Sequence, residues 1–170
     1  MTNTNLIDIS QEILNDNVIG KLSTFLGEER RKVRRGFLSS VASILNLFMA
    51  NTEDKTKVQF ILDFLKDPRF DGTMITELDR VLGGGPATSG IMDSGGVVIR
   101  SQIGDGFKSL VDNVVSDSAI SSVSAQKLLP LVASFLLNLI KKHSAGESPD
   151  ATGLIELLNS QKDGIASFLT

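Results

Sequence analysis

Five cationic side chains stand close together near the start of a predicted helix. They are Arg30, Arg31, Lys32, Arg34 and Arg35. Guanidinium and ammonium groups at this density can bind a nucleic-acid phosphate, a lipid headgroup or an acidic protein. No aromatic residue lies within the run, so stacking on bases is not indicated. The alternative interpretation is a solvated helix face whose charges are balanced by the carboxylates of a chain with net charge -3.

Two asparagines interrupt otherwise apolar helical segments. Asn46 follows Ile44 and Leu45, and Asn138 follows Leu136 and Leu137. A buried amide without a partner costs about 1–3 kcal/mol. The pattern therefore predicts a buried polar pair, in which the two amides bind each other or opposing backbone groups. A polar pocket for a small ligand is the other interpretation.

Groups that could catalyse a reaction are few. The chain has no cysteine and one histidine, His143, so a zinc site or a Ser-His-Asp triad would depend on that single imidazole. His143 follows two lysines at a predicted helix C-terminus, where cations complement the helix dipole. Asp63 and Glu156 have apolar neighbours that face inward, so both carboxylates should face solvent. We expect no catalytic residue, no metal site, no cofactor and no enzymatic activity.

The elements that must position these residues are predicted to be helices. Apolar residues recur at three- and four-residue steps, as is typical of amphipathic helices. The pattern predicts helices over 13–26, 28–49, 58–65, 75–82, 107–115, 125–142 and from 150 to the end. Pro130 should bend or shorten the most apolar of them. Between two groups of helices, the glycine-rich stretch 83–106 is predicted to be a mobile connection.

Composition indicates one globular domain over residues 1–170, with 41% hydrophobic and 22% charged residues. The apolar run 128–140 is too short to cross a bilayer core of about 30 Å as a helix, so it predicts a buried core helix and no membrane span. The N-terminus lacks the charge and apolar pattern of a secretory signal. We expect a cytoplasmic protein, and association with the cell envelope stays open.

The first and second halves of the chain match each other at a nearly constant offset. Residues 43–48 align with 135–140, which lie 92 positions later, and residues 61–66 align with 154–159, which lie 93 positions later. Asn46 then corresponds to Asn138, and Asp63 to Glu156. The match predicts two similar three-helix units, over about 14–67 and 107–160, related by a pseudo-twofold axis. Coincidence among common apolar helices is the alternative.

Several segments resemble the YidB-like bacterial family, catalogued as a domain of unknown function (number 937). The resemblance rests on residues 16–22, 103–106, 121–129 and 157–166, together with the glycine-rich centre. It implies an all-α, multihelical bacterial domain and no established activity. The charged opening of the helix at 28–35 departs from the small or acidic residues that this family usually has there.

The sequence thus predicts an all-α bundle of two similar three-helix halves joined by a glycine-rich loop. Its expected role is that of a non-enzymatic structural or protein-interaction module, which binds an unknown protein or a second copy of itself. The alternative is a regulatory protein that binds nucleic acid or another polyanion through the basic run 30–35.

Overall fold

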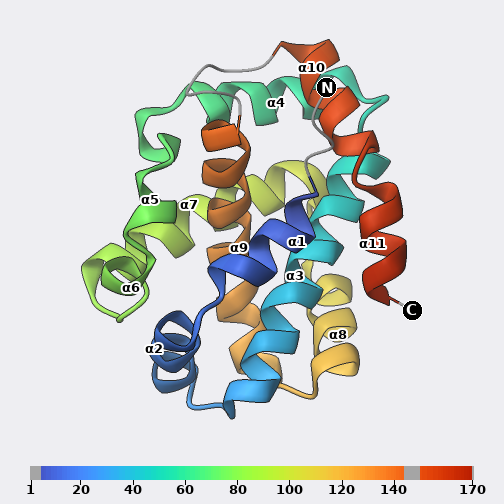
Figure 1. Ribbon diagram of the computed structural model, residues 1–170. Coiled ribbons are helices and arrows are strands. Elements are labelled where there is room, and N and C mark those ends of the chain that lie inside the picture. The colour runs from blue at the N-terminus through green and yellow to red at the C-terminus, as the bar shows by residue number, and fades with distance from the viewer. Residues whose placement is uncertain (1–4, 144–149, 170) are drawn as a thin grey trace.

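A computed structural model describes residues 5–143 and 150–169, and these residues form helices and no strand (Figure 1). The predicted all-α class is confirmed. The helices in chain order are α1 (Leu6–Ile13), α2 (Asp16–Leu26), α3 (Arg30–Ala50), α4 (Lys55–Lys66), the 3-10 helix η1 (Pro68–Phe70), α5 (Thr73–Thr76), α6 (Leu78–Val81), α7 (Pro86–Ile103), α8 (Phe107–Ser118), α9 (Ser122–His143), α10 (Ala151–Asn159) and α11 (Lys162–Leu169).

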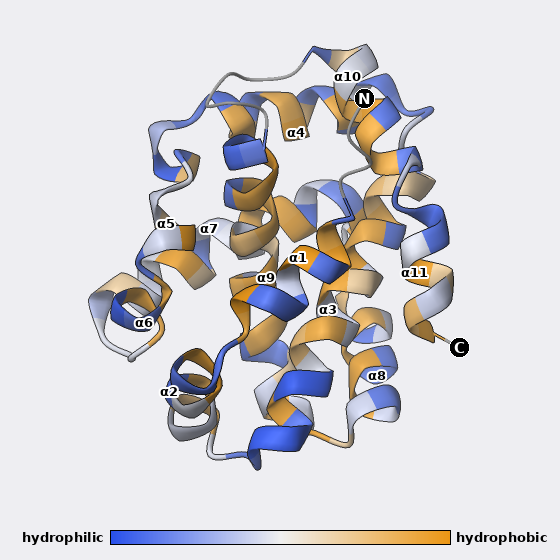
Figure 2. Cartoon of the chain, in the orientation of Figure 1, coloured by the Kyte–Doolittle hydropathy of each residue, from blue (hydrophilic) through white to orange (hydrophobic). Residues whose placement is uncertain are grey.

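Helix α9 runs through the centre of the bundle, and α3 packs beside it (Figure 1). All ten residues from 131 to 140 are buried. Phe37 of α3 meets Phe135 of α9 edge to face, with ring centroids 5.0 Å apart, a favourable aromatic geometry. Figure 2 shows apolar residues along most of α9, whereas the peripheral helices alternate between apolar and hydrophilic residues. The core therefore surrounds α9.

Helix α9 is longer than the predicted helix over 125–142. Its 22 residues are enough by length and composition to cross a membrane, so the expectation that this segment is too short is wrong for the whole helix. However, 78% of its most apolar window is buried inside the protein. It is thus the core helix that the sequence predicts. Pro130 lies inside α9 and does not end it.

The glycine-rich stretch 83–106 is not the predicted connection, because residues 86–103 of it form α7. Helices α7 and α9 pack very closely. A Cβ atom on Gly95 would lie only 1.7 Å from the carbonyl oxygen of Pro130, so only glycine permits this approach. Burial of Thr88, Val98 and Ile99 on the same helix adds contacts with the core. The small residues that suggest a flexible loop instead allow two helix backbones to approach each other.

The single helix predicted over 13–26 is two helices. Leu14 and Asn15 separate α1 from α2, and the Asn15 side chain accepts a hydrogen bond from the Val18 N–H at 2.9 Å. Asparagine at this position caps a helix N-terminus and so favours a new start. The predicted end of this helix at residue 26 is confirmed, because Gly27 ends α2 in the left-handed conformation with φ 68°. The helix predicted over 75–82 is likewise divided, into α5 and α6.

Candidate functional site

The basic run opens α3, as the sequence predicts. Helix α3 begins at Arg30, and its N-cap residue Glu29 makes no side-chain capping bond. Of the five cations, Arg30, Arg31 and Arg34 are exposed, whereas Lys32 and Arg35 are half-buried. The run is therefore at the surface, but its members differ in what they contact.

Three of these arginines bind groups of the protein itself. The Arg34 guanidinium donates to the carbonyl oxygen of Leu14 at 2.6 Å, and Leu14 is the residue that ends α1. A cation at a helix C-terminus complements the helix dipole. Arg30 donates to the Asp16 carbonyl oxygen at 3.4 Å. Arg35 forms an ion pair with Asp117 of α8 at 2.8 Å. Part of the run thus ties α1, α2 and α8 to α3.

A surface hollow of about 540 Å³ lies between α1, α3 and α11, and we call it the arginine hollow. Arg35 lies against the ring of Phe168, with its guanidinium carbon 4.3 Å from the ring centroid. None of the lining residues is acidic. They are Gln11, Arg31, Arg34, Arg35, Leu38, Ser167 and Phe168.

The predicted buried pair of asparagines is wrong for Asn46. Asn138 is buried, but Asn46 lies exposed on α3. Asn46 falls on the face of α3 that neighbouring helices leave to solvent, so matching sequence positions do not give matching environments. Asn138 uses its amide on other partners: it accepts from the Gly72 N–H at 2.9 Å and donates to the Ser134 carbonyl oxygen at 2.9 Å.

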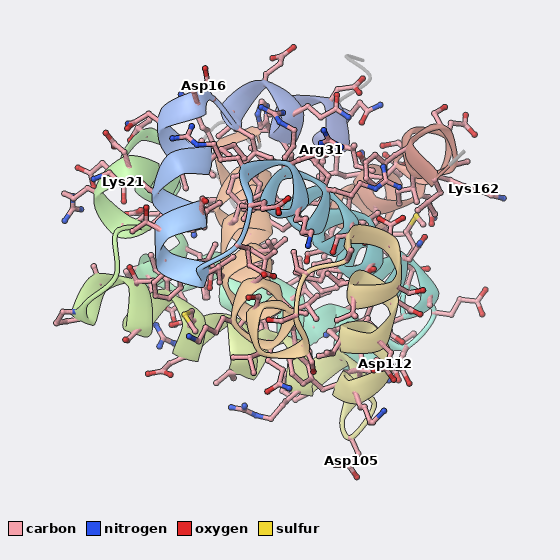
Figure 3. All side chains as sticks on the ribbon, turned by 90° about the horizontal axis from the view of Figure 1, so that it is seen from below. Asp16, Lys21, Arg31, Asp105, Asp112 and Lys162 are labelled. Atoms are coloured by element: carbon pink, nitrogen blue, oxygen red, sulfur yellow. The ribbon has the colours of Figure 1, made fainter. Side chains whose placement is uncertain are left out.

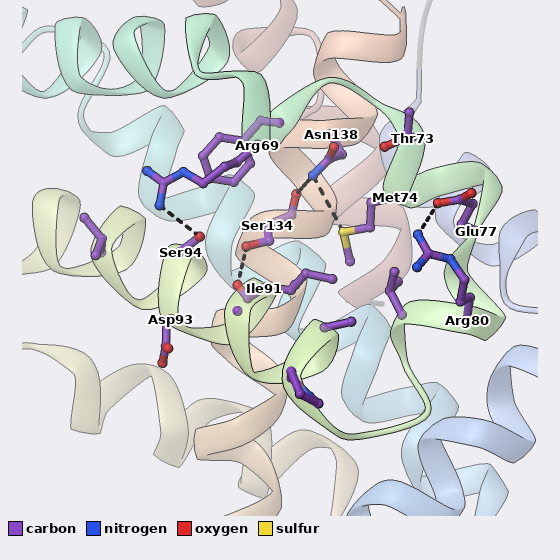
Figure 4. Close-up of a pocket in the computed structure, with 16 residues that line it drawn as sticks. Arg69, Thr73, Met74, Glu77, Arg80, Ile91, Asp93, Ser94, Ser134 and Asn138 are labelled. Carbon is purple, nitrogen blue, oxygen red and sulfur yellow. Dashed lines mark hydrogen bonds and ion pairs between the residues drawn. The ribbon is translucent and has the colours of Figure 1, made fainter.

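A second hollow, of about 580 Å³, lies beside Asn138, and we call it the α7 pocket (Figure 4). Helix α7 forms one wall, and the segment from η1 to α6 forms another. The residues that line it are Arg69, Phe70, Thr73, Met74, Glu77, Arg80, Val81, Pro86, Ala87, Gly90, Ile91, Asp93, Ser94, Val97, Ser134 and Asn138.

The polar groups of α9 in the α7 pocket are already hydrogen-bonded within the protein. The Ser134 hydroxyl donates to the Ile91 carbonyl oxygen at 2.6 Å. The Asn138 amide adds a contact to the Met74 sulfur at 3.6 Å (Figure 4). Among the buried side chains that the structure describes, no polar nitrogen or oxygen lacks a hydrogen-bond partner. The interior of the pocket therefore offers mainly apolar surface.

The rim of the α7 pocket carries charges of both signs. Arg80 pairs with Glu77 at 2.5 Å, and Arg69 pairs with Asp67 at 2.8 Å. The hydrogen bonds from the Arg69 side chain and backbone N–H hold the pKa of Asp67 below its usual range. Asp93 adds a further exposed carboxylate. The rim is thus close to balanced in charge, unlike the arginine hollow.

Comparison with protein families gives one match. Residues 9–143 match the family described as "Bacterial protein of unknown function (DUF937)". The chain belongs to this family. The predicted resemblance is confirmed over those residues, whereas the segment 157–166 lies outside the match. The DUF937 match contains all of the α7 pocket but not Ser167 and Phe168 of the arginine hollow. No curated protein and no solved structure matches the chain.

The remaining candidate residues stand apart from both hollows. Asp63 and Glu156 are exposed, as expected, and His143 is exposed at the C-terminal end of α9. No group of three or more His, Cys, Asp or Glu side chains within 5–143 and 150–169 could hold a metal ion. Sequence reasoning missed the α7 pocket because it treated the pocket's main wall as a loop. The apolar residues at 91, 92 and 97–99 were the available signal for a helix there.

Proposed function

We propose that this DUF937 protein is a non-enzymatic interaction module that receives an apolar side chain of another protein chain in the α7 pocket. The observation that carries the proposal is the pocket's combination of an apolar interior with a rim of paired charges. Protein interfaces have this arrangement, with an apolar centre that excludes water and a polar edge. The volume of about 580 Å³ is ample for one large apolar side chain and its neighbours.

The exposure of Val97 supports a partner at this position. Val97 is 45% exposed at the pocket, although it belongs to α7, whose other valine is fully buried. Phe60, Val123 and Leu169 are also exposed, but none of them lines the α7 pocket. Apolar surface that adjoins a pocket marks interaction sites better than single exposed side chains do.

The buried polar groups of α9 in the α7 pocket favour binding over catalysis. A nucleophile or general base must reach a substrate with a free lone pair or proton. Ser134 instead donates its proton to the Ile91 carbonyl oxygen, and both sides of the Asn138 amide are occupied. A polar small-molecule ligand would also need free polar groups inside the pocket.

Site-specific photo-crosslinking tests the proposal. A photoreactive phenylalanine derivative at position 97, within the bacterium, should give a discrete crosslinked product. The same substitution at Val123, which is 61% exposed outside the pocket, is the control. A product at twice the mass of the chain identifies a second copy, and any other mass identifies a different protein. Equal labelling from positions 97 and 123 contradicts the proposal.

We also propose that the chain contains an internal duplication. Helices α2, α3 and α4 have 11, 21 and 12 residues, and α8, α9 and α10 have 12, 22 and 9. Gly27 and Ala119, 92 positions apart, both end their helices in the left-handed conformation, with φ 68° and 64°. Under this proposal, the two halves diverged after the duplication. The divergence accounts for the unequal burial of Asn46 and Asn138 and for helix α7, which has no counterpart in the first half. Mirrored helix contacts add support, since α4 packs on α9 and α10 on α3.

A further inference from the structure

We propose that the arginine hollow is an anion-binding site that takes one carboxylate or phosphate group carried on an apolar body. It shares no residue with the α7 pocket, so the inference goes beyond the interaction proposed above. The ligand class follows from which side chains line the hollow, how they are charged and how they are held.

The hollow is built on one face of α3. Arg34, Arg35 and Leu38 lie three, four and seven positions after Arg31, so all four lie on the same side of the helix. Helices α1 and α11 close the other sides with Gln11 and Phe168. Helix α11 comes from the opposite end of the chain and contacts both α1 and α3. The site therefore exists only in the folded molecule.

Among residues 5–143 and 150–169, few carboxylates balance the positive charge in the hollow. Of its three arginines, Arg35 is the one with an ion pair in these ranges, to Asp117 at 2.8 Å. Arg34 binds a backbone carbonyl, which carries no net charge. For Arg31, no hydrogen bond or ion pair occurs among the described residues. In Figure 3, Arg31 lies in the upper part of the view, and the labelled Asp105 and Asp112 lie in the lower part. By contrast, both arginines at the rim of the α7 pocket pair with an acid.

Two of the three guanidinium groups are held in place before any ligand binds. The Leu14 carbonyl oxygen fixes Arg34 at 2.6 Å and uses one of its five N–H donors. Asp117 and the Phe168 ring fix Arg35 from two sides. Side chains that are already ordered lose less conformational entropy on binding. Their remaining donors can form paired hydrogen bonds with the oxygens of a carboxylate or phosphate.

The apolar lining decides between a discrete anion and a nucleic-acid strand. Leu38 and Phe168 lie beside the arginines and can pack against an apolar body attached to the anionic group. A strand would need a line of cations and aromatic faces free for its bases. Here Arg35 lies over the Phe168 ring, and Arg30 lines a different hollow, against α2. The cations of the run thus do not form one continuous track.

Titration with small probes tests the site. The probes are phenyl phosphate and benzoate, with benzyl alcohol as the uncharged analogue, followed by NMR of the arginine side-chain N–H groups and the phenylalanine rings. We expect saturable shifts at Arg31 and Phe168 with either anion and none with the alcohol. Comparison of the two affinities distinguishes the ligand classes: tighter binding of phenyl phosphate indicates a phosphate ligand, and tighter binding of benzoate indicates a carboxylate ligand.

Two variants locate the binding. Arg31→Gln should weaken anion binding about tenfold or more, since a hydrogen bond to a charged group is lost. Arg30→Gln, one position away and outside the hollow, should leave the affinity unchanged. Both residues are exposed, so both variants should fold, and circular dichroism checks this. Equal loss in both variants, no saturable binding, or binding of benzyl alcohol equal to that of the anions overturns the proposal.

The last measurement uses a single-stranded oligonucleotide, both as a ligand and as a competitor of phenyl phosphate. If it binds with steep salt dependence and loses affinity equally in Arg30→Gln and Arg31→Gln, the whole basic run is a polyanion face and the discrete site is wrong. If it fails to compete with phenyl phosphate, the discrete site is supported. Crosslinking from position 97 is independent of every result here, so the two proposals can fail separately.

Discussion

The Asn138 amide joins two segments that are distant in the sequence, helix α9 and residues 72–74. It accepts from the Gly72 N–H and donates to the Ser134 carbonyl oxygen, both at 2.9 Å, and it contacts the Met74 sulfur. Gly72 precedes α5 in the left-handed conformation with φ 92°. One buried side chain thus sets the position of the short segment that forms a wall of the α7 pocket.

Removal of this amide should destabilise the protein. Asn138→Ala leaves the Gly72 N–H buried without a partner, and we expect it to lower the free energy of unfolding by about 1–3 kcal/mol. Asn46→Ala is the matched control, because Asn46 is exposed on its helix, and should change the free energy by no more than about 0.5 kcal/mol. Urea unfolding followed by circular dichroism measures both. Equal effects would mean that the two asparagines have equivalent environments after all.

Ala119 is the one non-glycine residue with positive φ among the described residues. The left-handed conformation costs an L-residue about 1–2 kcal/mol, and glycine's extra backbone entropy offsets about 0.5–1 kcal/mol of that. Ala119→Gly should therefore stabilise the protein by about 0.5–1 kcal/mol. Gly27→Ala, at the corresponding end of α2, should destabilise it by about the same amount. Thermal unfolding of both variants checks the opposite signs, and the same sign in both would contradict the capping argument.

At the scale of elements, the sequence predicted best those helices whose amphipathic pattern is uninterrupted. Helix α4 ends before Pro68 and α3 opens with the basic run, as periodicity and helix-stop rules indicate. Helix α7 was missed because glycine has a low helix propensity, and its tertiary contacts override that preference. The sequence indicated the arginines of the hollow as possible anion-binding residues, but it did not indicate Phe168. No local sequence pattern predicts that α11 packs against α3.

The contact between α7 and α9 depends on the absence of a side chain at Gly95. Gly95→Ala places a Cβ against the backbone of Pro130, and such overpacking costs about 1–3 kcal/mol. Gly90→Ala is the control in the same helix, because its Cβ would meet nothing within 4 Å. Alanine's better helix propensity should make that variant more stable by up to about 1 kcal/mol. Urea unfolding measures the stability of both variants. If Gly95→Ala and Gly90→Ala stabilise the protein equally, α7 and α9 do not approach each other closely at Gly95.

At the scale of the whole molecule, helices from both ends of the chain depend on the same centre. Helices α3 and α9 pack on each other, α10 and α11 pack on α3, and α4 and α7 pack on α9. The buried Gln161, near the C-terminus, accepts a hydrogen bond from the Leu6 N–H at 2.8 Å and so ties the start of α1 to the end of the chain. The long helices α3 and α9 are therefore buried in one shared core.

This arrangement predicts a single cooperative unfolding transition. The calorimetric enthalpy should equal the van't Hoff enthalpy, at about 120 kcal/mol near 60 °C for a chain of this length, because a two-state transition requires that equality. Differential scanning calorimetry measures both quantities. Two resolved transitions, or a van't Hoff enthalpy near half of the calorimetric value, would instead mean that the two parts of the chain unfold separately. In that case the contact between α3 and α9 would be an interface between two domains. The α7 pocket, lined by α9 and by residues 69–97 that precede the second half, would then depend on how the connecting segment packs on α9.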